Sequence, residues 1–455
     1  MAVESTADKT KPRQATIQLR DLPRPPIHSA VGFAAFWADP EFARKQFDVR
    51  GDRMVVDLPL LPTMLFTAVP EDAKAVFTQV DSGLRLGEAL RRLAPHEMLF
   101  GREMIDWWNG ANHAKLRKKV APAFNGAALR GYEEAMVDAA KRRVDEWPVG
   151  EPVRFTRQMK TLARDVIMSV VFGVTEGDRR DRLEQALIDL DRAIASNGMR
   201  TRYVAAILSG GRWPRYTAMR EISARIDAVT LEEIAFRRAN PSPVQRKDCL
   251  AIFLELAEDD PENLLSDQMI AVFQRMLLIA GYETTAVTLA WVAERLVRHP
   301  EVMATLDQSL AAGADDYLDA VITETMRIRP ALPVTMRYAE KDVDINGLRV
   351  PKGTIVMLYI NAIQKREEFY PNPDEFDPDR FLGVRPDPHR WLPFGGGAHR
   401  CLAANFAMFE SRVLLRTILT HRRLLPDAGA GERQDQHRNI LLTPHRGATV
   451  TLAHR

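Results

Sequence analysis

The sequence predicts a mainly α protein, with one large helical body and a smaller β-rich part. The first observation is a series of apolar stretches with helical periodicity, separated by Gly, Pro or acidic breaks. These stretches lie at residues 110–123, 127–146, 156–173, 180–198, 217–238 and 266–298. The second observation is that short β-like runs are confined to residues 53–68 and to the chain after Pro330. Helices are therefore expected to form most of the core.

The composition is that of an ordinary globular protein. Apolar residues make up 46% and charged residues 27% of the 455 residues, which excludes a disordered or fibrous protein. The 63 Lys and Arg residues exceed the 61 Asp and Glu residues by two, so no overall positive field indicates a nucleic-acid partner. Only two cysteines occur, Cys249 and Cys401. A disulfide framework is thereby excluded, and a reducing, cytoplasmic compartment is expected.

Residues 1–26 end in a Pro-rich run and are expected to be a flexible lead-in to a single domain over residues 27–455. The stretch from Met1 to Leu22 is polar and basic, and it holds no apolar run of signal-peptide or anchor length. No membrane anchor is therefore expected.

The longest helical pattern, at residues 266–298, is expected to be the spine of this domain. At about 1.5 Å per residue it would extend on the order of 50 Å, which crosses a whole domain. Gln274, Arg275 and Glu283 interrupt its apolar stretch. Because a central charge costs roughly 2.5–3.5 kcal/mol on insertion, a membrane span is not expected.

The β-like runs predict small sheets on either side of the helical body. Residues 54–58 and 64–67 flank two prolines and predict a hairpin. Residues 343–350 and 354–360 predict further strands, and the Pro- and Asp-rich residues 370–380 predict an ordered meander that is not regular helix.

The strongest motif is a Gly-rich loop that opens into an apolar helix, at residues 392–407. Cys401 is expected in the first turn of this helix, where the positive helix end stabilises a thiolate, and three glycines would let backbone amides approach the sulfur. A thiolate in a dry pocket suits a bond to haem iron and favours cleavage of the O–O bond. A buried structural cysteine and a cysteine nucleophile are the alternatives.

A second motif, Ala-Gly-Tyr-Glu-Thr-Thr at residues 280–285, lies in the middle of the long helix. A Thr hydroxyl there can bond the carbonyl of Ala280, which would open the helix ladder at Gly281 and make a groove for O₂ and water. The alternative is an ordinary polar patch on a buried helix.

A third motif places Glu324 and Arg327 three residues apart, and therefore on one face of a helix. By itself this is an ordinary exposed pair, worth only a few tenths of a kcal/mol.

These motifs, in this order, resemble the cytochrome P450 family, and the closest likeness is to its soluble actinobacterial members. The loop matches the family's haem signature Phe-x-x-Gly-x-(His/Arg)-x-Cys-x-Gly at Phe394, Gly397, His399 and Cys401, with Ala403 in place of the last glycine. Alanine is a better helix former by about 1 kcal/mol, so slight tightening and no loss of haem are expected. The resemblance implies the cytochrome P450 fold, with haem between the long central helix and the cysteine loop.

The resemblance also implies roles for the other two motifs. Glu324 and Arg327 would form a buried triad with Arg380 of the meander and hold the cysteine loop in place. Glu283 and Thr284 would be the acid–alcohol pair that delivers protons to bound oxygen.

The implied cofactor is haem b, iron protoporphyrin IX, with Cys401 as the ligand of the iron. Its two carboxylates must be neutralised in a largely apolar pocket, which calls for basic side chains. The family's positions for this task are His113, Arg117, Arg337 and His399. Further expected cofactor contacts are Phe394, Gly397, Ala280 and Gly281.

The implied function is a monooxygenase that inserts one atom of O₂ into a hydrophobic small molecule, by hydroxylation or epoxidation. Electrons would come from a separate ferredoxin or flavodoxin-type donor with its reductase, and Lys115, Lys118 and Lys119 offer a basic face for docking. The expected substrate-lining segments are residues 82–105, 273–279, 332–335 and 441–443.

Two alternatives are a non-enzymatic haem-binding protein and a peroxide-driven haem-thiolate enzyme. Neither needs Glu283 and Thr284, so the presence of this pair argues against both. NADH consumption with surrogate ferredoxin and reductase that is coupled to an oxygenated product would exclude a pure binder, and turnover with H₂O₂ alone would identify a peroxide-driven enzyme.

Overall fold

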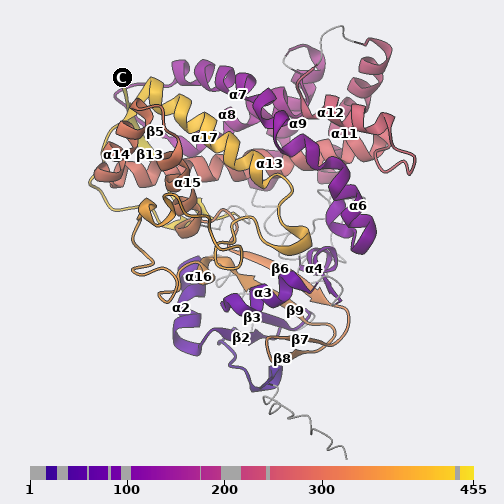
Figure 1. The fold of residues 1–455 in the computed structure, drawn as a ribbon, viewed down its shortest axis with the longest axis vertical. Helices are drawn as coiled ribbons and strands as arrows, with labels where there is room; N and C mark the ends of the chain where they lie inside the picture. The colour runs from indigo at the N-terminus through magenta and orange to yellow at the C-terminus, as the bar shows by residue number, and fades with distance from the viewer. Residues whose placement is uncertain are drawn as a thin grey trace, which may run out of the picture.

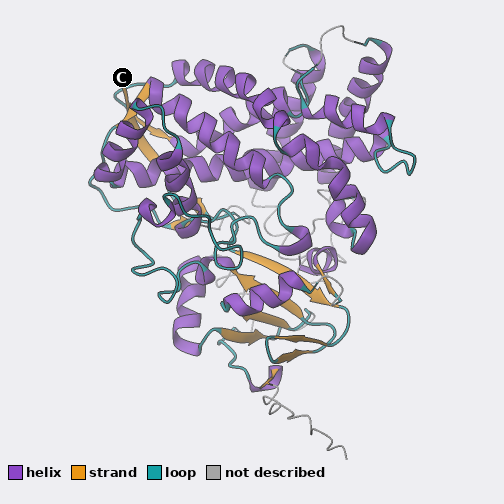
Figure 2. Cartoon of the chain, viewed as in Figure 1, coloured by secondary structure: helices purple, strands orange, loops and turns teal. Residues whose placement is uncertain are grey.

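The structure is a computed structural model that describes residues 17–27, 39–58, 61–79, 83–93, 104–174, 176–195, 217–241, 246–435 and 441–455. Figure 1 shows two regions, a broad helical body and a smaller part built around a sheet. The strands of the smaller part lie on one side of the helical body, as the colouring of Figure 2 shows.

Most of the predicted helices are present, with boundaries within a few residues of those expected. The helices are α2 (Pro40–Arg50), α3 (Pro70–Thr78), α4 (Leu86–Leu93), α6 (Gly110–Val120), α7 (Ala127–Glu146), α8 (Phe155–Val170), α9 (Asp178–Ala195), α11 (Thr217–Ala239), α12 (Cys249–Glu258), α13 (Asp267–Arg298), α14 (Pro300–Ala311), α15 (Asp316–Ile328), α16 (Ile360–Ile363) and α17 (Ala404–His421). The periodicity did not single out α2, α3, α4, α12, α14 and α16, whereas α15 and α17 were expected from the Glu324–Arg327 motif and from the apolar helix that follows the cysteine loop.

The strands form one larger sheet and several small ones. They are β1 (Ile17–Gln18), β2 (Arg53–Val56), β3 (Met64–Thr67), β4 (Leu84–Arg85), β5 (Pro152–Arg154), β6 (Val334–Ala339), β7 (Val343–Ile345), β8 (Leu348–Val350), β9 (Ile355–Tyr359), β10 (Arg422–Leu424), β11 (Gln434–Asp435), β12 (Thr443–Pro444) and β13 (Thr449–His454). The five-stranded sheet has the order β2-β3-β9-β6-β4. The predicted hairpin is confirmed, since β2 and β3 pair antiparallel.

The central helix α13 organises the helical body. The Ser266 side chain caps its start by accepting a hydrogen bond from the backbone N–H of Met269 at 3.2 Å, and Pro300 begins the next helix two residues after its end. Among the described residues α13 is the one helix long and apolar enough to cross a membrane, and 72% of its most apolar window is buried. Its apolar surface is therefore used in packing against α8, α11, α15 and α17.

The flexible lead-in expected over residues 1–26 needs a correction at its C-terminal end. Ile17 and Gln18 pair in parallel with Leu348 and Arg349 of β8, and Leu19 is buried. Residues 17–26 are therefore tied to the fold by backbone pairing with a segment more than 300 positions away, which no local pattern predicts; residues 1–16 lie outside the described residues.

Candidate functional site

The cysteine loop turns tightly between the 3₁₀ turn Gly397–His399 and α17. The backbone N–H of Cys401 donates to the carbonyl of Phe394 at 2.9 Å. Cys401 lies three residues before the start of α17 at Ala404, so the prediction that it sits in the first helical turn was wrong. At Ala403, φ is −91°. Alanine adopts this conformation freely, so the backbone does not require glycine there.

Two glycines of this loop, Gly396 and Gly397, lie close against α3. A Cβ atom on Gly396 would lie 2.3 Å from the ring of Phe77, and one on Gly397 would lie 2.5 Å from the Phe77 carbonyl oxygen. Gly397 also has a φ of +68°, which favours glycine. This contact differs from the predicted one, in which the loop glycines would let backbone amides approach the sulfur.

Gly396→Ala is therefore expected to displace the loop from Phe77 and to lower the free energy of unfolding by about 1–3 kcal/mol, the usual cost of overpacking. Chemical denaturation of the purified variant measures this difference. Gly131→Ala is the matched control, because its added methyl group meets only Lys247 side-chain atoms at 3.9–4.0 Å. An equal effect of both substitutions would contradict the packing role.

The Cys401 thiol is exposed and yet poorly solvated. Burial by the surrounding protein raises the pKa of Cys401, although the backbone N–H of Ala403, Arg400 and Arg117 act in the opposite direction. Desolvation outweighs these favourable charges, so the protein alone does not hold the sulfur as a thiolate, contrary to the expectation from the helix end. A bound metal ion deprotonates a coordinating thiol outright.

Four basic side chains meet beside the loop, from three parts of the chain. Arg337 on β6 donates to the carbonyl of Gly396 at 3.4 Å, and Arg117 on α6 donates to the carbonyl of Cys401 at 3.5 Å. The rings of His113 and His399 stack with centroids 4.3 Å apart. Figure 1 places α6 between the helical body and the sheet. Side chains of α6 can therefore meet residues from both regions.

The cluster is largely buried: His113 and Arg337 are buried, and Arg117 is half-buried. Desolvation lowers the pKa of Arg337 to about 10 and that of His399 to about 3, the latter aided by Arg337. Burial also lowers the pKa values of His113 and Arg117. Within the described residues neither arginine forms an ion pair, and Nδ1 of His399 has no hydrogen-bond partner. The cluster therefore offers two cations and a free ring nitrogen to an anionic group.

Glu324 and Arg327 form a fully buried bidentate pair in α15. Arg327 donates from Nε and Nη2 to the two carboxylate oxygens at 2.6 and 2.7 Å, and its remaining N–H groups reach the carbonyls of Gln364, Pro373 and Glu375. Arg380 lies farther away, with Nε 3.6 Å from the Glu324 carboxylate, and Nε makes no hydrogen bond. Arg327 is thus the main partner of Glu324. Arg380 adds a positive charge near Glu324 without a hydrogen bond to it.

Gln364, which the sequence analysis missed, connects this pair to the cysteine loop. Its side-chain N–H group donates to the carbonyls of Met326 and Arg327 at 3.1 and 2.9 Å. Its side-chain oxygen accepts from the backbone N–H of Leu392 at 2.6 Å. One buried amide thus joins the end of α15 to the start of the loop that carries Cys401.

The central motif of α13 shows the expected hydroxyl contact without a break in the helix. Thr284 donates from Oγ1 to the carbonyl of Ala280 at 2.7 Å, and α13 runs continuously through this point, so the expected opening at Gly281 is absent. A Cβ atom on Gly281 would lie 3.0 Å from Ile167. Gly281 therefore faces α8, and close helix packing accounts for its small size.

Three charged groups around this motif were not predicted. Lys160 of α8 forms an ion pair with Glu283 at 2.5 Å. Tyr282 donates a hydrogen bond to Asp191 of α9. Thr285 donates to Glu410 of α17 at 3.1 Å, and burial raises the pKa of Glu410 to about 8. Each contact joins segments more than 90 positions apart, so sequence spacing gives no signal for them.

The basic outer face of α6 is partly neutralised. Lys115 pairs with Glu262 at 2.8 Å and Lys119 with Asp260 at 3.1 Å, whereas Lys118 is exposed. Two of the three predicted docking lysines are therefore engaged with the segment before α13.

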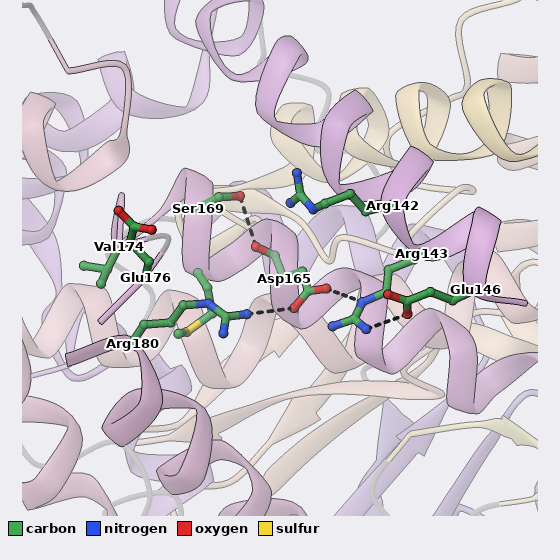
Figure 3. A pocket seen from close by; sticks show the side chains of 9 residues that line it. Arg142, Arg143, Glu146, Asp165, Ser169, Val174, Glu176 and Arg180 are labelled. Atoms are coloured by element: carbon green, nitrogen blue, oxygen red, sulfur yellow. Dashed lines mark hydrogen bonds and ion pairs between the residues drawn. The ribbon is translucent and has the colours of Figure 1, made fainter. Parts of the chain in front are cut away.

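A polar cavity of about 360 Å³ lies away from these residues, between α7, α8 and the turn before α9. Figure 3 shows Asp165 between Arg143 and Arg180, which it binds at 2.5 and 3.5 Å. Its lining contains none of the predicted site residues: Arg142, Arg143, Glu146, Asp165, Met168, Ser169, Val174, Glu176 and Arg180. The three arginines and three carboxylates of this lining balance one another in charge, and the cavity contributes nothing to the predicted site.

An exposed cysteine beside two arginines without an ion pair among the described residues, in a mainly helical fold, is the arrangement that a haem-thiolate protein needs. Within the described residues no group of three or more His, Cys, Asp or Glu side chains could hold a metal ion instead. The sequence model of the family "Cytochrome P450" matches residues 62–452. The chain belongs to the cytochrome P450 family, whose members are monooxygenases that carry haem b.

Relatives and a solved structure agree with this membership. The chain is 35% identical to cytochrome P450 137 of Mycobacterium tuberculosis over 379 residues, which covers 83% of this chain and 78% of the relative. It is 34% identical to cytochrome P450 135B1 of Mycobacterium bovis over 399 residues, covering 85% and 81%. The structure of retinoic acid-bound cyanobacterial CYP120A1 shares the fold, with a TM-score of 0.77, 21% identity and coverage of 96% and 100%. The predicted P450 fold and bacterial affinity are confirmed.

The residues present fit haem b. Its two carboxylates match Arg117 and Arg337, neither of which has an ion-pair partner in the described part of the chain, and the free Nδ1 of His399 lies beside them. The sulfur of Cys401 remains accessible for a bond to iron.

Proposed function

We propose that this protein is a monooxygenase that hydroxylates or epoxidises a hydrophobic small molecule, with Cys401 as the ligand of the haem iron. The observation that carries the proposal is the exposed Cys401 beside Arg117 and Arg337, two cations that have no ion pair among the described residues. When bound, a thiolate-ligated haem supplies the activation of O₂. All further tasks fall to side chains of the chain itself.

Binding and orientation of the haem are assigned to the cation cluster and the loop. Arg117 and Arg337 would bind the haem carboxylates, and His113 and His399 would complete that end of the pocket. Phe394 and Gly397 of the loop and Ala280 and Gly281 of α13 remain the proposed contacts to the ring. Of these, Ala280 is exposed, whereas Gly281 faces Ile167, so Ala280 has the better support.

Proton delivery is assigned to Thr284 and Glu283. Thr284 Oγ1 holds its own proton in the bond to the Ala280 carbonyl and can pass it on by rotation about the side chain. Glu283 would restore this proton, and its ion pair with Lys160 connects it to a partly exposed cation. Glu324, Arg327 and Arg380 are assigned to holding the cysteine loop.

The substrate and the electron donor are proposed by chemical class. A hydrophobic substrate is proposed because the expected lining segments are mostly apolar. Phe273 and Leu277 of α13 are buried in the core, and residues 82 and 94–103 of the expected lining lie outside the described residues. A separate ferredoxin or flavodoxin-type donor with its reductase is proposed, and the exposed cations Lys118 and Arg400 beside the loop support docking of an acidic partner.

The compartment and the domain limits are also proposed. Two free cysteines favour the cytoplasm. A single domain that includes residues 27–455 is supported by the family match over residues 62–452.

The function is tested with the haem-loaded protein, surrogate ferredoxin, its reductase and NADH under ¹⁸O₂. Substrates are first selected from a compound library by the shift of the Soret band from low to high spin. One ¹⁸O atom in the product is the expected result. Haem loading without any oxygenated product would favour a binding protein, and turnover with H₂O₂ alone would favour a peroxide-driven enzyme.

Thr284→Ala is expected to keep haem binding but to divert electrons into peroxide, because the proton donor at the oxygen site is lost. Oxygenated product per NADH should fall roughly tenfold or more, measured together with the H₂O₂ formed. Thr288→Ala is the matched control, since Thr288 makes the same kind of backbone bond one turn later, at 3.0 Å to Thr284. Undiminished coupling in Thr284→Ala would show that the relay assignment is wrong.

A further inference from the structure

The ring of Phe77 lies between the cysteine loop and one of the cations assigned to the haem carboxylates. Phe77 is 6% exposed and is the next-to-last residue of α3. A Cβ atom on Gly396 would lie 2.3 Å from Cδ2 and 2.5 Å from Cε2 of Phe77, so the loop backbone packs directly on this ring. Cζ of Arg337 lies 5.7 Å from the ring centroid, within the range of a cation–π attraction. One side chain therefore contacts both parts of the site.

The guanidinium of Arg337 depends on few neighbours for its orientation. Its Nη1 donates to two oxygen atoms of its own strand β6, at 2.7 and 3.3 Å, and its Nη2 donates to the carbonyl of Gly396 at 3.4 Å. Asp106, a carboxylate of this cluster, lies 3.9 Å from Nδ1 of His399 and forms no ion pair with Arg337 among the described residues. Phe77, Arg337 and Gly396 thus form a triangle in which each member contacts the other two.

A buried carboxylate fixes the start of α3, so this helix cannot move away from the loop. Asp72 is 0% exposed. It accepts hydrogen bonds from Nε of Arg53 at 2.8 Å and from Oγ1 of Thr67 at 2.7 Å, and from Nδ2 of Asn346 at 3.2 Å. These partners belong to β2, to β3 and to the turn between β7 and β8. The ring of Phe77, five residues further along α3, is therefore held at a fixed position.

We propose that Phe77 is a positioning residue that couples the two ends of the haem site. Its ring orients the guanidinium of Arg337 toward a haem carboxylate, and it sets the position of the cysteine loop at Gly396. This inference rests on the proposed function, since it requires Arg337 to bind a haem carboxylate and Cys401 to bind the iron. The negative face of the ring attracts the cation and keeps water away from it. An aliphatic side chain would fill the space without that attraction.

The contact with Arg337 is tested by titrating the full-length protein with haemin and following the Soret band. Phe77→Leu keeps an apolar side chain but removes the ring, and haem affinity should fall roughly five- to thirtyfold, the effect of losing a desolvated cation–π pair. In the Arg337→Gln background the same substitution should change haem affinity less than about twofold, because the attraction is already absent. Equal losses in both backgrounds would overturn the positioning of Arg337.

Phe47→Leu is the matched control for this titration. Phe47 is 5% exposed, belongs to the same hydrophobic cluster as Phe77 and packs on the ring of Tyr359 at 5.3 Å between centroids. Its substitution should leave haem affinity within about twofold of the wild-type value. A loss as large as that of Phe77→Leu would mean that general packing, and not support of the cation, explains the effect, which overturns the proposal.

The contact with the loop is tested by a reversal experiment on the haem-loaded protein. Gly396→Ala should lower the fraction of the reduced carbon monoxide complex that shows the red-shifted Soret band, because the displaced loop carries the sulfur away from the iron. Adding Phe77→Ala to Gly396→Ala should restore this fraction to that of Phe77→Ala alone, since the nearest atoms that the new methyl group meets are ring atoms of Phe77. The haemin titration uses only Phe77→Leu, so the proposal stays testable if Phe77→Ala does not fold.

Gly397→Ala is the matched control for the reversal. Its methyl group would meet backbone atoms of Phe77, the carbonyl oxygen at 2.5 Å and Cα at 3.0 Å, and its φ is +68°, so truncation of the Phe77 side chain cannot relieve it. A loss in Gly396→Ala that Phe77→Ala leaves unchanged, or equal relief in Gly397→Ala, would overturn the role at the loop. A wild-type protein that takes up no haem, or shows no red-shifted band, would instead overturn the proposed function, so the two failures are distinguishable.

Discussion

Cys401→Ser is expected to abolish the red-shifted Soret band of the reduced carbon monoxide complex. That band requires a strongly electron-donating thiolate ligand of the iron, and a serine hydroxyl, which is much less acidic than a thiol, cannot replace it. The effect should be complete, because each haem has a single sulfur ligand. Absorbance spectra of the reduced protein with and without carbon monoxide measure it.

Cys249→Ser is the matched control for this prediction. Cys249 is 2% exposed, and burial raises the pKa of its thiol far above the ordinary value, so it is an inert core side chain. This variant should keep the band and lose some stability. A red-shifted band that persists in Cys401→Ser would show that another residue binds the iron.

Glu324→Ala is expected to lower the free energy of unfolding by roughly 3–5 kcal/mol, the cost of leaving a buried charge without its partner. Arg327 would lose two of its bonds while remaining fully buried, and the backbone N–H of Asp377, which donates to Glu324 at 3.1 Å, would lose its acceptor. Chemical denaturation monitored by circular dichroism measures the loss.

Glu88→Ala is the matched control, because Glu88 and Arg91 have the same three-residue spacing and a distance of 2.6 Å but lie at the surface. That substitution should cost less than about 1 kcal/mol. Similar losses in the two variants would contradict the structural role of the buried pair.

The sequence predicted those parts of the protein that are encoded locally. The long apolar pattern at residues 266–298 corresponds to α13, and the two short apolar runs within residues 53–68 correspond to the hairpin of β2 and β3. The loop was identified because Phe394, Gly397, His399 and Cys401 match the family's haem signature within one short stretch of the sequence.

The sequence did not predict contacts between distant segments. Asp106, Lys160 and Glu410 have no motif around them, and their partners lie more than 90 positions away. Position 396 needs a glycine because the ring of Phe77, more than 300 positions earlier in the chain, packs against it. Similarly, the balance that keeps the Cys401 thiol protonated depends on desolvation, which only the three-dimensional surroundings determine.

The buried amide of Gln364 has a consequence for biosynthesis. Its bonds span Met326, Arg327 and Leu392, so the cysteine loop reaches its final place only when these separately synthesised stretches have come together. A chain in which these stretches have not yet come together would carry Cys401 on a loop that is not fixed in place, and it would hold haem poorly. Substitutions that remove these hydrogen bonds should therefore lower the haem content of the protein in cells before they lower the amount of protein.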